Sequence, residues 1–171
     1  MCARTTRLFF TSLLGGAISV WAAHPLPVGA QSSAKSDEDR LLLGTWKLNL
    51  AKSTYRSGPP PRSQTRTYEP QGQSVKATIQ TTYADGRSTT VGYVANYDTL
   101  EYAVTGSPDA DTIALKRVAP RSAEATLMHA GKVIATASRV ISEDGDILTI
   151  TYQGVQLGSQ VDYIAVYDKQ K

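Results

Sequence analysis

The sequence is poor in the residues that most often perform chemistry in small proteins. Its single cysteine is Cys2, and its two histidines are His24 and His129. Cys2 and His24 lie in an N-terminal segment that we expect to be removed. The rest of the chain then has no disulfide, no cysteine nucleophile and no thiolate metal ligand. His129 alone does not build the multi-histidine zinc sites of hydrolases, so neither a metal nor a cofactor is expected.

Residues 1–30 have the pattern of a secretory signal peptide. Arg4 and Arg7 precede an apolar run over residues 8–20, and Ala30 ends a small-residue sequence that suits cleavage. An uncleaved membrane anchor is the alternative, but the apolar run is near the lower limit for a span and prolines follow it. We expect export to the periplasm or the extracellular space, with no membrane span after cleavage.

The remaining chain divides into a short lead-in and one domain. Residues 31–40 are rich in serine and charge, which predicts a disordered lead-in. Residues 41–171 form one domain of ordinary size. The formal net charge is +3, and two positive charges leave with the signal peptide, so nucleic acid is not an expected partner. Residues 40–87 are basic and residues 88–171 acidic, which indicates either attraction of an anionic ligand or envelope, or an ordinary solvated face.

Short alternating segments separated by turn sequences dominate the domain. In residues 75–83 every second side chain falls on one face, and residues 89–97 repeat the pattern. Asp85-Gly86 between them predicts a two-residue type I′ hairpin turn. A turn capped by Asn49 is the one place that invites a helix. Ten strands are expected in all, at residues 42–48, 63–69, 75–83, 89–97, 101–105, 112–118, 123–129, 132–142, 147–153 and 161–168.

The number of strands bears on how the sheet closes. An antiparallel meander of about eight to ten strands leaves two exposed edges unless it closes on itself. We therefore predict an all-β fold: an antiparallel up-and-down barrel with very little helix and with room for one small ligand. A two-sheet sandwich with a solid core is the alternative, because strand count and turn spacing do not separate the two folds.

Several motifs carry a family resemblance. The Gly-x-Trp pattern of Gly44 and Trp46 resembles the opening strand of lipocalins and of intracellular fatty-acid-binding proteins. The run GTWKLNLAKSTYRSGPPPRSQTRTYEP, with TGSPDADT and the terminal VYDKQ, resembles uncharacterised bacterial secreted lipocalin-like proteins of the calycin type. This resemblance spans nearly all of residues 42–171. It implies a barrel whose end is plugged by Gly44 and Trp46, with Arg139 or Lys169 packed across the indole.

The resemblance does not extend to fatty-acid specificity. Fatty-acid-binding proteins place a two-helix lid between their first two strands. Residues 50–62, which occupy that place here, are too few and carry three prolines. The C-terminal strand also lacks the paired arginine and tyrosine of those proteins.

Three residues are the candidate ligand contacts, namely Arg139, Tyr93 and Tyr152. Arg139 shares a strand face with Ala135 and Ala137, whose small side chains leave space in front of it. If that face points inward, the guanidinium is an internal cation that needs a carboxylate from the protein or a ligand. If it points outward, it pairs with a surface acid. Tyr93 and Tyr152 either line a cavity or pack on the outer surface.

These patterns favour a secreted, non-catalytic binding protein for a small hydrophobic or amphipathic ligand. An enzyme is not expected, because no nucleophile, metal or acid–base constellation stands out. Asp109, Asp111, Asp144 and Asp146 fall in expected turns, where an aspartate bonds its own backbone. The alternative is an envelope protein–protein interaction or inhibitor module, whose contact is the proline loop of residues 57–62.

Overall fold

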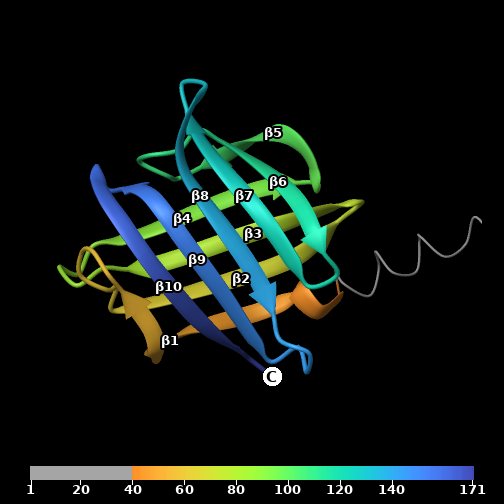
Figure 1. Cartoon of the computed structure of the whole chain (residues 1–171), viewed down its shortest axis with the longest axis horizontal. Helices are drawn as coiled ribbons and strands as arrows, with labels where there is room; N and C mark the ends of the chain where they lie inside the picture. The colour runs from red at the N-terminus through yellow and green to blue at the C-terminus, as the bar shows by residue number, and fades with distance from the viewer. Residues whose placement is uncertain (1–39) are drawn as a thin grey trace, which may run out of the picture.

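The structure, a computed structural model, describes residues 40–171. Each of its strands pairs antiparallel with its sequence neighbours, and β1 pairs with β10, so the sheet closes into a barrel. The predicted barrel of ten strands is confirmed, and the sandwich is wrong. The strands are β1 (Gly44–Tyr55), β2 (Ser63–Gln71), β3 (Ser74–Thr82), β4 (Ser88–Ala95), β5 (Asp98–Thr105), β6 (Thr112–Ala119), β7 (Ser122–His129), β8 (Lys132–Ile141), β9 (Ile147–Gln156) and β10 (Ser159–Lys169) (Figure 1).

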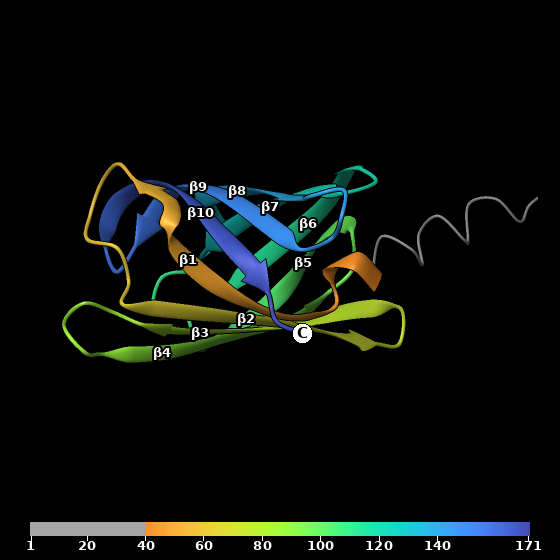
Figure 2. The same ribbon diagram turned by 90° about the horizontal axis from the view of Figure 1, so that it is seen from below.

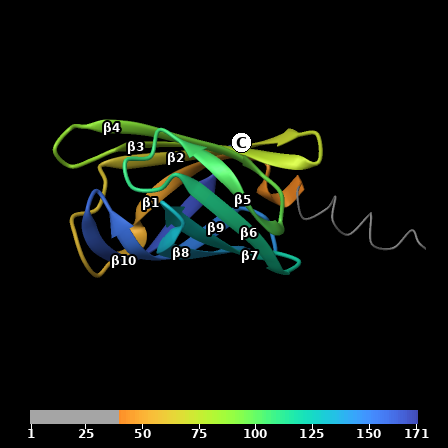
Figure 3. The ribbon, with the colours of Figure 1, turned by 90° about the horizontal axis from the view of Figure 1, so that it is seen from above.

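The barrel is flattened. Seen from below, β2, β3 and β4 form one layer and β7 to β10 form the other (Figure 2). The opposite view shows β5 and β6 joining the two layers on one side (Figure 3). The predicted signal peptide and residues 31–39 of the predicted lead-in lie outside the described residues. Within the described part, no helix is long and apolar enough to cross a membrane.

Among residues 40–171, helix is confined to one turn over residues 40–42, which includes the last residue of the predicted lead-in. The expected turn at Asn49 remains within β1 instead. There the Asn49 carbonyl accepts a hydrogen bond from Ser53 Oγ (2.7 Å), and Asn49 Oδ1 accepts one from the Lys52 N–H (3.2 Å). The register of β1 against β10 shifts between Asn49 and Thr54. The cap that a helix would use therefore stabilises a bulge in a strand.

The hairpin between β3 and β4 differs from the predicted type I′ turn. Gly86 has a φ of +87°, but Asp85 does not have positive φ, which a type I′ turn needs at both central residues. Instead the Gly86 N–H bonds the Tyr83 carbonyl (3.0 Å), and the Tyr83 N–H bonds the Arg87 carbonyl (2.8 Å). This is a three-residue loop with glycine in the left-handed position. The Asp85 carboxylate accepts the Arg87 N–H (3.0 Å) and so stabilises the wider turn.

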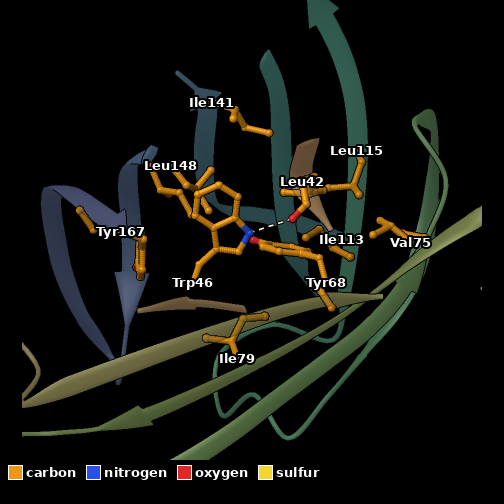
Figure 4. Close-up of a cluster of buried hydrophobic side chains, with 14 of the residues drawn as sticks. Leu42, Trp46, Tyr68, Val75, Ile79, Ile113, Leu115, Ile141, Leu148 and Tyr167 are labelled. Atoms are coloured by element: carbon orange, nitrogen blue, oxygen red, sulfur yellow. Dashed lines mark hydrogen bonds between the residues drawn. The ribbon is translucent and has the colours of Figure 1, made fainter. Parts of the chain in front are cut away.

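One end of the barrel is closed by a dry cluster around Trp46. The indole is fully buried and donates its Nε1–H to the Leu42 carbonyl (2.8 Å), as Figure 4 shows. Leu42, Leu148 and Tyr167 are the other large side chains in the described part of the chain that are buried almost completely. The helical turn at residues 40–42 thus seals this end, because its last residue supplies the acceptor that the buried indole requires.

Lys169, rather than Arg139, packs across the indole. Its Nζ lies 5.0 Å from the Trp46 ring centroid and donates a hydrogen bond to the Leu41 carbonyl (2.7 Å). Gly44, with a φ of +116°, has no side chain in the path of this lysine. A Cβ there would lie 3.4 Å from Lys169 Cε. The glycine therefore serves two purposes, a backbone conformation that other residues rarely adopt and room for the lysine stem.

Candidate functional site

The barrel interior beyond the Trp46 cluster holds a cavity of about 150 Å³. Every strand except β1 contributes to its wall. Small inward-facing residues of β7 and β8 leave this space open, since Ala125 lies opposite Ala137 and Ala123 lies opposite Arg139 in the strand pairing. Alanine fills less of the space between the layers than the leucines and isoleucines elsewhere on the inner face.

Arg66 of β2 projects into this cavity and is held by a polar network. Its Nε donates to Gln64 Oε1 (3.1 Å), and its guanidinium lies 5.2 Å from the centroid of the Tyr167 ring. The same Gln64 oxygen accepts a hydrogen bond from the Tyr167 hydroxyl, while Gln64 Nε2 donates to Thr81 Oγ1 (2.7 Å). Gln64 and Thr81 are buried, so these bonds fix the amide and thereby the direction of the arginine.

Arg139 of β8 enters the cavity from the opposite layer. Its Nη2 donates a hydrogen bond to the Tyr97 hydroxyl, and its guanidinium lies 5.4 Å from the Tyr97 ring centroid and 5.5 Å from that of Tyr68. Arg117 lies over the same Tyr97 ring at 4.2 Å. Arginine remains protonated at any pH at which proteins fold, so Arg66 and Arg139 each place a fixed positive charge at the cavity.

Tyr68 connects the two cations. Burial by itself would raise the pKa of its hydroxyl. The charges of Arg66 and Arg139, with their hydrogen bonds to the phenol, outweigh burial, and the pKa of Tyr68 is lowered from its usual value. For Tyr93, burial is the largest effect and neighbouring Tyr68 adds to it, so the pKa of Tyr93 is raised. Tyr68 of β2 and Tyr93 of β4, which flank Ala77 of β3, therefore have pKa values shifted in opposite directions, because only Tyr68 is dominated by the arginines.

The positive charges have no carboxylate partner within the described part of the chain. The groups that interact with the two guanidiniums are tyrosines and Gln64. Two acids border the cavity, Asp109 and Glu124. Asp109 is occupied with backbone N–H groups, and Glu124 is exposed. A low-dielectric interior with two cations and no internal anion attracts an anion from outside.

Aromatic rings form much of the remaining wall. Tyr152 stacks on Tyr163 with ring centroids 5.1 Å apart and planes 6° apart, and Tyr163 also contacts Tyr55 at 5.2 Å. The Tyr152 hydroxyl donates to the Val155 carbonyl (2.9 Å). Burial raises the pKa of Tyr152 to about 12, and the charge of Asp109 contributes to that rise. Tyr152 thus offers the cavity a ring face rather than a free hydroxyl.

The three predicted contacts, Arg139, Tyr93 and Tyr152, all border this one cavity. Their contact with a ligand remains a prediction. Arg66 and Tyr68 were not predicted as site residues, although with Gln64 they occupy alternate positions of one predicted strand. That strand is polar on both faces, so its alternation gave no sign of which face points inward. The other basic side chains between residues 40 and 87 are exposed, so only Arg66 carries that segment's charge inside.

Two aspartates of the turn sequences, Asp109 and Asp111, differ from the prediction that each bonds its own turn. Asp109 does not bond its own turn. It accepts the N–H groups of Leu157 (2.6 Å) and Gly158 (3.1 Å) at the tip of the β9–β10 hairpin. Asp111 Oδ2 likewise accepts the Ala130 N–H (2.7 Å) from the β7–β8 hairpin. These carboxylates connect separate hairpins, because barrel closure places the turns of one rim beside each other. The local pattern of Asp144 accepting the Asp146 N–H (3.1 Å) does follow the prediction.

The proline loop lies away from the cavity lining. Residues 57–62 are held by Ser57, whose Oγ accepts the Asp162 N–H (2.8 Å), and by the neighbouring pair of Arg56 and Asp162 (3.2 Å). Pro59 and Pro60 are exposed. The loop thus presents prolines to solvent and does not cover the arginines.

Comparison with known proteins adds the fold alone. No protein-family model and no curated protein matches the sequence. Rv2717c from M. tuberculosis is 17% identical, with a TM-score of 0.50 over 80% of this chain and 98% of that chain. The zebrafish ileal bile acid-binding protein, complexed with cholic acid, is 10% identical, with a TM-score of 0.44 over 76% of this chain and 99% of that chain. The likeness to Rv2717c agrees with the closed antiparallel barrel that the strand pairing shows over the described residues.

Proposed function

We propose that the protein is a non-catalytic binding protein that holds a small amphipathic molecule with an anionic group inside the barrel. The observation that carries this proposal is the pair of cavity-facing cations, Arg66 and Arg139, whose partners in the described chain are uncharged. An anionic group between them would supply the missing counter-charge through charge-assisted hydrogen bonds. The aromatic and aliphatic walls would take up the apolar part of the same molecule.

The proposal also includes export. The signal-peptide pattern of residues 1–30 supports secretion to the periplasm or the extracellular space, and the motif resemblance supports membership of the bacterial secreted lipocalin-like group. Such a protein would bind its ligand outside the cytoplasm without transforming it. Native mass spectrometry of the exported protein, purified from its own host, shows whether the chain is cleaved after Ala30 and whether a ligand remains bound.

The decisive experiment replaces each internal arginine by methionine, which keeps most of the side-chain length and removes the charge. Calorimetric titration with an acid and its matched neutral analogue, such as octanoate and octanol, should show at least tenfold tighter binding of the acid. Arg66→Met and Arg139→Met should each weaken acid binding at least tenfold. Lys76→Met removes an exposed cation paired with Glu69 (3.2 Å) on the outer surface and should leave binding unchanged.

Stability of the same variants provides a second readout. Burying a cation without a counter-charge costs free energy, so Arg139→Met should raise the free energy of unfolding by about 1 kcal/mol and shift the denaturant midpoint upward. If acid binding fell equally in Lys76→Met and Arg139→Met, attraction by net charge rather than by the cavity would explain it, and the proposal would be wrong.

A further inference from the structure

We propose that the ligand is a compact aromatic monoacid, a single six-membered ring bearing a carboxylate, rather than a long-chain or polycyclic acid. This inference rests on the proposed function, because it specifies the size and shape of the anion that the cavity holds. Three features of the described residues carry it: the volume of the cavity, the rings on its wall, and the fixed direction of its arginines.

Volume sets the upper limit. The cavity measures about 150 Å³, and an apolar protein cavity of about 150 Å³ accepts benzene. A twelve-carbon fatty acid has roughly twice as many non-hydrogen atoms as benzene, and a bile acid has more still, so neither fits entirely inside this volume. One ring therefore fills the apolar part of the space, and its carboxylate extends between the guanidiniums.

Side-chain packing at one end of the cavity and hydrogen bonds at the other fix the residues that border it. At the closed end, Tyr68 lies against the Trp46 cluster (Figure 4). At the opposite end, residues 107–110 border the cavity. The carboxylate of Asp109 is anchored there by the Leu157 and Gly158 N–H groups, while Ser107 Oγ accepts the N–H groups of Asp109 (3.2 Å) and Ala110 (3.0 Å). A loop bonded to a neighbouring hairpin in this way restricts the room for a long tail.

The walls favour a ring over an aliphatic chain of equal volume. Tyr152 stacks on Tyr163, its pairing partner on β10, so this wall of the cavity consists of parallel aromatic rings. Tyr93 of β4 adds a further ring to the cavity wall from the opposite layer. Stacked or edge-to-face contacts between aromatic rings contribute beyond the burial of apolar area.

The acid group is specified by the arginines. A carboxylate is planar and accepts paired hydrogen bonds from a guanidinium fork. Gln64, fixed by Thr81 and Tyr167, sets the direction of Arg66, so this donor is oriented before the ligand arrives. Arg139 approaches from the facing layer, with its Nη2 on Tyr97. Both guanidiniums bond the Tyr68 hydroxyl, so the two oxygens of one carboxylate placed beside it can accept a hydrogen bond from each arginine, whereas a neutral ring leaves both without a counter-charge.

Titration calorimetry with benzoate, benzamide, laurate and cholate tests the inference. Benzoate should bind at least tenfold more tightly than each of the other three. Ala137→Leu, which fills the cavity from β8 without changing charge, should abolish benzoate binding. Ala103→Leu places the same side chain on an exposed position of β5 and should have no effect. Unfolding of both variants by denaturant verifies that they fold.

The outcomes separate this inference from the proposed function. If laurate or cholate bound more tightly than benzoate and lost affinity in Arg139→Met, the size limit would be wrong and the anion-binding function would stand. If benzamide matched benzoate, the acid requirement would be wrong for both proposals. If none of the four compounds bound to the folded protein, both proposals would be overturned.

Discussion

The two ends of the barrel interior differ in how they treat positive charge. At the closed end, the Lys169 ammonium bonds the Leu41 carbonyl and lies over the Trp46 ring, and the large apolar side chains around the indole are buried. In the cavity, Arg66 and Arg139 share uncharged tyrosines and border open volume. The Lys169 ammonium thus has its partners within the protein, whereas Arg66 and Arg139 still need an anion as counter-charge.

This difference indicates that stability and binding reside in separate parts of one core. The closed end buries large apolar side chains with their polar atoms paired, which is the arrangement that stabilises a fold. At the cavity, the small side chains of Ala125 and Ala137 leave space unfilled, and the two arginines border that space. A residue of the first part should affect unfolding, and a residue of the second should affect ligand binding.

The largest effect is expected from the closed end. Trp46→Ala removes a fully buried indole and its bond to the Leu42 carbonyl, and should lower the free energy of unfolding by about 3–5 kcal/mol. Denaturant unfolding followed by circular dichroism measures this loss. Tyr93→Ala, at the cavity, serves as the comparison and should cost less, because its ring already borders open space. Equal losses in the two variants would contradict the separation.

Alkaline pH should produce the next largest effect. Burial raises the pKa of Tyr152 to about 12 and raises that of Tyr167 as well. A tyrosine whose folded pKa lies above its unfolded value stabilises the fold below about pH 10, and this contribution is lost as pH rises toward the folded pKa. The melting temperature should therefore fall between about pH 10 and pH 12.

Tyr68 allows the sign of this effect to be tested. Since its folded pKa is lowered, Tyr68 adds stability as the pH rises toward about 10 and contributes a constant amount above that pH. Tyr152→Phe should make the decline of the melting temperature between about pH 10 and pH 12 shallower. Tyr68→Phe should instead make the slope just below about pH 10 more negative and leave the decline above it unchanged. Thermal unfolding at several pH values gives both slopes. The same slope in both variants would show that the arginines do not control Tyr68.

More of the fold than of the candidate site could be predicted from the sequence. Alternation in residues 75–83 and 89–97 predicted β3 and β4 and divided each strand into two faces, and the structure shows that the face of β3 with Val75, Ala77 and Ile79 is the inner one. The turn at Asp85-Gly86 was placed correctly but its type was wrong, since the Asp85 side chain bonds the Arg87 N–H and widens the loop. The bulge at Asn49 escaped prediction because it depends on pairing with β10, which lies at the far end of the chain.

The site required barrel closure. Arg139 was predicted as a candidate ligand contact because it shares a strand face with two alanines, whose small side chains leave space in front of it. Arg66 lies among threonines and glutamine, and no local pattern distinguishes an inward arginine there from a surface one. Only the approach of β2 and β8 across the barrel brings both cations to Tyr68. Long-range pairing also decided that Lys169, and not Arg139, covers Trp46. Both residues occur late in the chain, so sequence position did not separate them.

The smallest expected effect is the one that separates the two ends most directly. Lys169→Met keeps an apolar stem over Trp46 but removes the ammonium from the indole face and from the Leu41 carbonyl. Its free energy of unfolding should fall by about 1 kcal/mol, while the benzoate dissociation constant should stay within twofold of the original. Arg139→Met should show the reverse, with weakened benzoate binding and no loss of stability. Each variant removes one cation from the barrel interior, so a difference between them reflects position and not charge. If Lys169→Met weakened binding as much as Arg139→Met, the closed end and the cavity would form one electrostatic unit, and the assignment of binding to the two arginines would need to include Lys169.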